Sequence, residues 1–240
     1  MPGAVDAGGT GQRGRAPGSL AHTGCMVDAY ERAGRDFFAR GVHELAPMLL
    51  GGVLLRSSAD GEVGVRITEV EAYAGCDDPG SHAFRGQTAR NATMFGPPGH
   101  LYCYFTYGMH HALNVVCDAV GTPTGCLLRA GEVVVGRDLA LARRTARPRR
   151  TPLPDRLLAS GPGNLAQALG ADLTSDAADL CLPDGQWSWW RPPAPATGVC
   201  AGPRVGVSGP GGDGDAYPWR FWLPGEASVS TYRPAAPRRR

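Results

Sequence analysis

Lysine is absent from this sequence of 240 residues, and all 24 basic residues are arginine. Mechanisms that need a side-chain amine are therefore excluded, such as those of Schiff-base lyases, aldolases, pyridoxal enzymes and the P-loop lysine. The net charge of +2 is too small to indicate nucleic acid or an acidic membrane as a partner by itself. Long apolar runs are also lacking, so we expect no membrane span and, near the first residues, no secretory signal.

Paired cysteine motifs are missing as well. The seven cysteines include no C-x-x-C pair, and Cys103, Cys117 and Cys126 lie inside apolar runs. This usage is typical of reduced, buried thiols, so we expect a cytoplasmic protein without a disulfide framework or zinc site.

The pattern of turns and apolar runs predicts one α+β domain over residues 25–233 without βαβ alternation, between a tail at 1–24 and a basic tail at 234–240. The tryptophan-rich stretch 187–195 is interpreted as a surface loop. Predicted helical segments are one that begins at Asp28, then 42–50, 137–147, 155–159 and 164–169. Predicted strands are 53–56, 63–73, 101–107, 111–117, 125–129, 205–207, 219–223 and 229–232.

Two carboxylates follow the apolar face of the predicted strand 63–73. If no bulge intervenes, Glu69 and Glu71 continue the face of Ile67 and precede Tyr73. Because burying a carboxylate is costly unless it is paired, the pattern favours a general base at the end of a strand. The alternative is that the strand has left the core by Glu69 and both side chains are solvated.

A second candidate is the turn Asp77-Asp78 followed by His82. With Glu69 and Glu71 it could form a carboxylate-and-histidine metal site, but no ligand motif supports this interpretation.

The predicted hairpin 101–117 has an unusual tip, Tyr107-Gly108-Met109-His110, with Tyr102 and Tyr104 behind it. An apolar tip of this kind is typical of proteins that push a side chain between base steps, although it could also fold back onto the core. Asn114 interrupts an apolar run and could bond backbone groups or a base edge. Arg129 could contact a phosphate or form a buried ion pair.

Several motifs occur in an order that resembles the alkyladenine (3-methyladenine) DNA glycosylase family, over roughly residues 40–232. They are Glu69-Val70-Glu71-Ala72-Tyr73, His82, Met94-Phe95, 97–104, Tyr107-Gly108-Met109, Asn114-Val115, 127–130, Gly161-Pro162-Gly163 and 204–207.

The resemblance implies a single α+β domain, a curved antiparallel β-sheet with flanking helices and a protruding β-hairpin that inserts into DNA. It also implies a monomer without metal or cofactor whose partner is duplex DNA containing a damaged purine, in the cytoplasm and nucleoid-associated if bacterial. Such an enzyme flips alkylated or deaminated purines into a pocket and excises them: 3-methyladenine, 7-methylguanine, hypoxanthine and ethenoadenine. Without lysine, we expect no lyase step.

The resemblance further implies roles for single residues. Glu71 would activate water, and Arg129 would position that water and the phosphate of the lesion. Tyr73, His82 and Tyr104 would form the walls of the base pocket, and Asn114 would screen out purines that bear a 2-amino group. Tyr107 would fill the gap in the duplex, with Met109 beside it.

Two other functions remain open from the sequence. One is a non-catalytic protein that binds damaged DNA through the same hairpin. The other is a metal-dependent nuclease that uses Glu69, Glu71, Asp78 and His82.

Overall fold

Antiparallel pairing organises the part of the chain that the computed structural model describes, residues 29–106, 108–147 and 149–235. The sheet path is β1-β8-β2-β3-β6-β5-β4; β10 pairs with β3 and β9, and β7 with β6. The strands are β1 (Glu31–Arg32), β2 (Val53–Ser58), β3 (Gly61–Tyr73), β4 (Leu101–Thr106), β5 (His110–Cys117), β6 (Thr124–Val135), β7 (Ala159–Ser160), β8 (Trp187–Arg191), β9 (Cys200–Gly202) and β10 (Arg220–Trp222). One α+β domain with a large antiparallel sheet is therefore confirmed.

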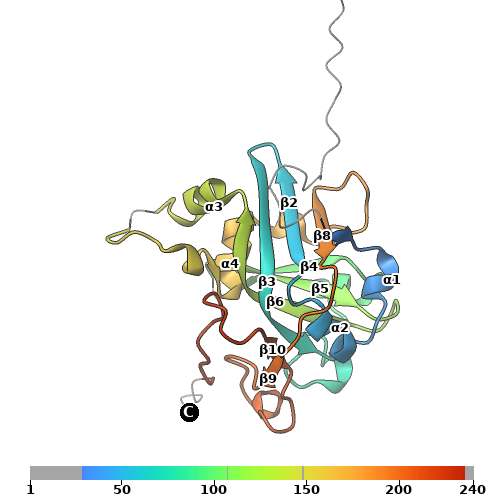
Figure 1. Ribbon diagram of the computed structural model, residues 1–240. Coiled ribbons are helices and arrows are strands. Elements are labelled where there is room, and N and C mark those ends of the chain that lie inside the picture. Colours follow the sequence, from blue (N-terminus) through green and yellow to red (C-terminus); the bar gives the residue numbers. More distant parts are fainter. Residues whose placement is uncertain (1–28, 107, 148, 236–240) are drawn as a thin grey trace, which may run out of the picture.

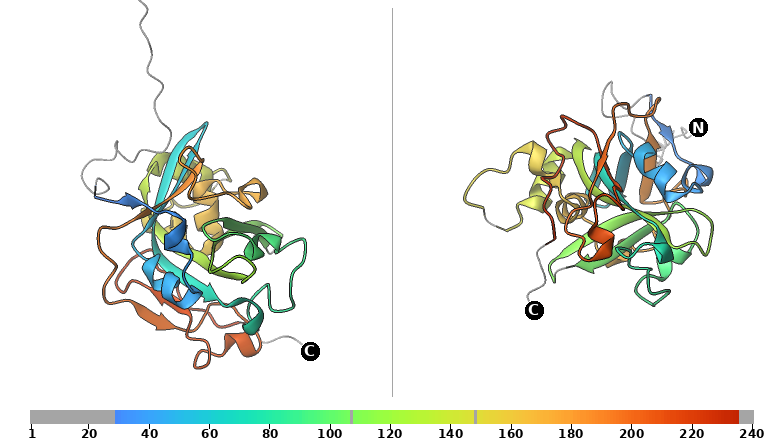
Figure 2. Two further views of the ribbon diagram at one scale, coloured as in Figure 1. Left: turned by 90° about the vertical axis from the view of Figure 1, so that its right-hand side faces the viewer. Right: turned by 90° about the horizontal axis from the view of Figure 1, so that it is seen from below.

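Short helices flank this sheet. In Figure 1, α3 and α4 lie to the left of β3 and α1 and α2 to its right, while Figure 2 shows the same arrangement from the side and from below. The α-helices are α1 (Arg35–Phe38), α2 (Val42–Met48), α3 (Arg137–Arg144) and α4 (Pro162–Leu169). The 3-10 turns are η1 (Gly75–Asp77), η2 (Ala92–Phe95), η3 (Asp155–Leu157), η4 (Leu173–Ser175) and η5 (Pro210–Gly212). No helix among the described residues is long and apolar enough to cross a membrane.

The long strands β3 and β6 form the centre of the sheet. Their register shifts on both sides of Glu69, between Ile67 and Glu69 and between Glu69 and Val70. The regular alternation predicted for 63–73 is therefore interrupted, and Thr68, Glu69, Val70 and Glu71 are all fully buried. The alternative in which both carboxylates are solvated is wrong.

Several local predictions are also wrong. Asp28 lies outside the described residues, but Glu31 and Arg32 of the helix predicted there form β1, because they pair with Arg191 and Trp190 of β8. The stretch predicted as a surface loop contains β8, which places the alternating Trp187 and Trp189 in the core.

Predicted strands near the C-terminus have mixed outcomes. Residues 219–223 contain β10, as predicted. Residues 205–207 turn instead at Gly206, whose φ of 71° is left-handed. Residues 229–232 form no strand because the N–H of Ser230 donates to the Glu69 side chain rather than to a neighbouring strand. The predicted tail 1–24 lies outside the described residues.

Close approach of β3 to β6 gives the first prediction. A Cβ on Gly131 of β6 would lie 2.5 Å from the Arg66 carbonyl oxygen, whereas one on Gly125 of the same strand would lie 3.5 Å from its nearest neighbour. Gly131→Ala should lower the free energy of unfolding by about 1–3 kcal/mol through overpacking. Gly125→Ala should change it by much less. Urea unfolding of both variants checks this; equal stability would contradict the tight contact at Gly131.

Candidate functional site

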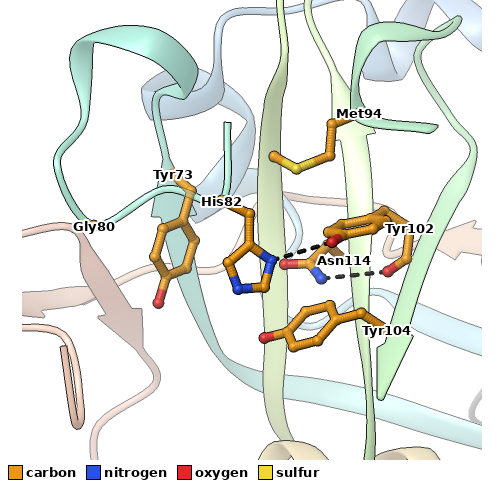
Figure 3. Close-up of a pocket in the computed structure, with 7 residues that line it drawn as sticks. All are labelled: Tyr73, Gly80, His82, Met94, Tyr102, Tyr104 and Asn114. Carbon is orange, nitrogen blue, oxygen red and sulfur yellow. Dashed lines mark hydrogen bonds between the residues drawn. The ribbon is translucent and has the colours of Figure 1, made fainter. Parts of the chain in front are cut away.

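A cavity opens where β3, β4 and β5 present their side chains next to the segment that follows η1. It encloses about 340 Å³, part of it open to solvent. The lining residues are Tyr73, Gly80, His82, Met94, Tyr102, Tyr104 and Asn114 (Figure 3). The four pocket residues predicted from the sequence, Tyr73, His82, Tyr104 and Asn114, therefore converge on one cavity.

Aromatic rings form most of the cavity wall. In Figure 3, Tyr73 lies on one side of His82, and Tyr102 and Tyr104 lie on the other. The His82 and Tyr104 ring centroids are 4.5 Å apart in an edge-to-face arrangement, and those of Tyr102 and Tyr104 are 5.3 Å apart. Such surfaces suit a flat heterocycle, because rings bind it by stacking and attract it more strongly when it is cationic.

The polar groups of this wall are uncharged at neutral pH. Nδ1 of His82 is hydrogen-bonded to the Tyr102 hydroxyl at 3.1 Å. Burial, with a further effect of Arg90, lowers the pKa of His82, and burial raises the pKa of Tyr102 to about 12. The Asn114 amide donates to the Tyr102 carbonyl at 3.3 Å, and its own oxygen points toward His82 and the cavity (Figure 3).

Glu71 lies directly behind the Tyr73 wall. The Tyr73 hydroxyl donates to one carboxylate oxygen of Glu71 at 2.8 Å, and the Val205 N–H donates to the other at 2.6 Å. Burial and the neighbouring Glu71 raise the pKa of Tyr73 well above its ordinary value, so the phenol stays protonated as a donor. The carboxylate is fully buried but adjoins the cavity through this ring.

Glu69 is the centre of a second hydrogen-bond network. Its carboxylate accepts hydrogen bonds from Arg129 Nε at 2.8 Å and Arg220 Nε at 2.7 Å, and from both the N–H and the hydroxyl of Ser230. Burial by itself would raise the pKa of Glu69. The positive charge of Arg129 and the hydrogen bonds from Ser230 outweigh this effect, so the pKa of Glu69 is lowered. Glu69 is therefore a buried anion whose charge is fully paired.

Arg129 joins the two carboxylates. Besides its contact with Glu69, its Nη1 lies 3.3 Å from Glu71 Oε1. Burial acts against the charged form, but Glu71 and Glu69 together raise the pKa of Arg129. Of the two possibilities left by the sequence, the structure places Arg129 in a buried ion pair.

A fully buried arginine, Arg204, packs against the ring of Tyr73 but does not line the cavity itself. Its guanidinium forms two hydrogen bonds with Asp78, of 2.6 and 2.8 Å, and lies 4.5 Å from the Tyr73 ring centroid. Asp78 therefore faces an arginine rather than the glutamates. No group of three metal-ligating side chains occurs among the described residues.

The hairpin of β4 and β5 lies at the edge of the sheet and carries an exposed apolar tip. The side chain of Met109 is 66% exposed, and Phe105 below it is also exposed. The alternative in which the tip folds onto the core is therefore wrong for Met109. Tyr107 lies outside the described residues.

Sequence reasoning missed the residues that complete these networks. Arg204 stood in a motif without an assigned role, and Arg220 and Ser230 were not singled out. Their partners are more than 100 residues away along the chain. The only available signal was the excess of carboxylates in β3, which required buried cations from elsewhere.

A family model and several known proteins match this chain. A family model described as "Methylpurine-DNA glycosylase (MPG)" matches residues 36–227. A protein of Streptomyces avermitilis named "Putative 3-methyladenine DNA glycosylase" is 51% identical over 208 residues, 86% of this chain and 94% of that protein. Proteins of the same name from Leifsonia xyli and Frankia casuarinae are 53% identical over 201 residues and 47% identical over 218. They cover 83% and 86% of this chain, and 92% and 94% of their own lengths.

These matches span most of the chain and confirm the resemblance drawn from its motifs. The chain therefore belongs to the methylpurine-DNA glycosylase family, and it is a DNA repair enzyme that hydrolyses N-glycosyl bonds in damaged DNA.

Proposed function

We propose that this glycosylase excises alkylated purines of the 3-methyladenine and 7-methylguanine class, and neutral lesions such as hypoxanthine and ethenoadenine, from duplex DNA. The names of its relatives support the alkylated class. The observation that carries the mechanism is the position of Glu71, a buried carboxylate bonded to a ring of the cavity wall.

The proposed reaction begins with extrusion of the damaged nucleotide. Flipping costs a few kcal/mol, least for a damaged pair, and a side chain that fills the gap opposes return of the base. We assign this role to the hairpin tip, with Tyr107 and Met109. The flipped purine then lies among Tyr73, His82 and Tyr104.

Breaking the C1′–N bond gives the sugar oxocarbenium character. Glu71 stabilises this charge and takes a proton from the water that attacks C1′, while Arg129 orients Glu71 and the water. A purine alkylated at N3 or N7 already carries positive charge and leaves readily. Because the chain contains no lysine, no side-chain amine can form a Schiff base with the abasic sugar, and the product is an intact abasic site.

One assay separates this function from its rivals. Methylated duplex DNA is incubated with the protein in the presence of EDTA, and free base and strand breaks are measured. Released base with intact strands supports the proposal. Binding without release would favour a non-catalytic DNA-binding protein, and strand cuts that EDTA abolishes would favour a metal-dependent nuclease.

The first site prediction concerns Glu71. Glu71→Gln removes the carboxylate that accepts a proton but keeps its size, so single-turnover excision of 3-methyladenine should fall at least ~100-fold, the usual contribution of a general base. Affinity for lesion DNA should remain close to that of the original protein. Near-normal turnover would contradict the assignment.

The neighbouring Glu69 is the matched comparison. Glu69→Gln leaves Arg129 and Arg220 without their shared anion, so the free energy of unfolding should fall by about 3–5 kcal/mol. Because the pKa of Glu69 is lowered in the fold, its contribution to stability is present at neutral pH and is lost as the pH falls below the ordinary value of 4.5. Urea unfolding at pH 7 and pH 4 should show this loss in the original protein and a smaller one in Glu69→Gln.

Asn114 gives a prediction on selectivity. We propose that its side chain crowds a 2-amino group, so that neutral guanine is disfavoured, whereas 7-methylguanine is still excised because its positive charge lets it leave readily. Asn114→Gly should therefore increase excision of guanine-like bases, measured with guanine opposite thymine, while hypoxanthine serves as a control substrate without that group. Unchanged selectivity would leave Asn114 a purely structural residue.

Met109 gives a prediction on DNA binding. If its exposed side chain is buried against the duplex, Met109→Ser should weaken binding to lesion DNA at least about tenfold, since burying a methionine contributes about 1.5–3 kcal/mol. Val120 is equally exposed but lies beyond the opposite end of β5 from the hairpin tip, so Val120→Ser should leave the affinity unchanged. An equal loss of affinity in the two variants would contradict a role of the hairpin tip in DNA binding.

A further inference from the structure

Two aromatic walls of the cavity each have an arginine over the ring. The Arg204 guanidinium lies 4.5 Å from the Tyr73 ring centroid, and that of Arg90 lies 5.6 Å from the Tyr104 centroid. Neither arginine lines the cavity. A cation bound to one ring draws π-electron density toward itself and so weakens the attraction of that ring for a second cation.

The charge of Arg204 is cancelled locally. Arg204 is fully buried and is paired with Asp78 through two hydrogen bonds. A base in the cavity therefore faces a neutral ion pair behind Tyr73.

The charge of Arg90 has no such partner. Arg90 is exposed, and it donates a hydrogen bond to the Phe105 carbonyl at 3.3 Å, which holds it beside the β4 strand. No acidic side chain in the described part of the chain forms an ion pair with it. Its charge lies close to the cavity, because Tyr104, whose ring it contacts, is part of the lining, and it also contributes to the lowered pKa of His82.

We propose that Arg90 is a specificity-determining residue that reduces the preference of the cavity for cationic purines over neutral ones. This inference rests on the proposed function, in which Tyr104 stacks on the flipped base. Without Arg90, the wall formed by Tyr104 would attract a methylated, positively charged purine more strongly than hypoxanthine. With Arg90 in place, part of that attraction is removed and repulsion between like charges is added, so neutral lesions compete better for the same cavity.

The test compares two substrates that both lack a 2-amino group, so that Asn114 treats them alike. One substrate is 3-methyladenine, a cationic base, in methylated dA·dT duplex, and the other is hypoxanthine, a neutral base, in duplex DNA. Single-turnover excision and binding are measured for both. Arg90→Gln should raise the ratio of 3-methyladenine to hypoxanthine excision about threefold to tenfold. Arg90→Lys retains the charge and should keep the original ratio.

Arg85 provides a matched control. It is exposed in the same segment, and none of the cation–ring contacts among the described residues involves it. Arg85→Gln removes the same charge and should leave the ratio unchanged.

The outcomes are distinct. A parallel loss of both activities in Arg90→Gln would mean that Arg90 acts on DNA in general, and it would overturn the proposal. An unchanged ratio, or an equal rise in Arg85→Gln, would overturn it as well. If the original protein released neither base, the proposed function itself would fail.

Discussion

Two buried carboxylates on one central strand set the main constraint on this molecule. Glu69 and Glu71 are fully buried in β3, where unpaired negative charge would cost several kcal/mol per ion. Arg129 from β6 contacts both, and Arg220 from β10 adds a second positive charge at Glu69. The two anions are thus matched by two cations. This pairing fixes the strands on both sides of β3 and holds Glu71 behind Tyr73, a ring of the cavity wall.

The two carboxylates differ in what surrounds them. Every bond to Glu69 comes from groups that hold the fold, namely two arginines and Ser230. One carboxylate oxygen of Glu71 instead accepts a hydrogen bond from the Tyr73 hydroxyl, and the ring of Tyr73 lines the cavity. The bulge around Glu69 allows both side chains to be buried although their surroundings differ. Glu69 is therefore bonded only to groups of the fold, whereas Glu71 is bonded to a ring of the cavity wall, which fits the role proposed for it.

How far the sequence predicted this arrangement depends on the range of the contacts. The strand 63–73 and the hairpin 101–117 were predictable, because period-2 alternation marks them, and the residues that line the cavity were predicted from the resemblance to a known family. Trp187 and Trp189 were misassigned, since prolines nearby suggested a loop while the alternation of the tryptophans indicated a strand. Arg204 and Ser230 were not predictable in their roles: each meets its partner only after the chain has returned across the sheet, and one sequence carries no signal for such pairings.

Among the described residues, none of those that line the cavity carries a charged side chain. Its polar groups are the neutral His82, the phenols and the Asn114 amide, while the charges of Glu71, Arg204 and Arg90 lie one layer behind the rings. A purine can therefore enter without stripping water from an ion, which would weaken binding. The charges of these three side chains can still act on a base in the cavity, because electrostatic interactions in a partly dry site are stronger than in water. In the proposed reaction, a ring-lined cavity with charge behind it separates two tasks: the rings accept bases of different charge, and the negative charge of Glu71 acts on the sugar cation that forms only during bond cleavage.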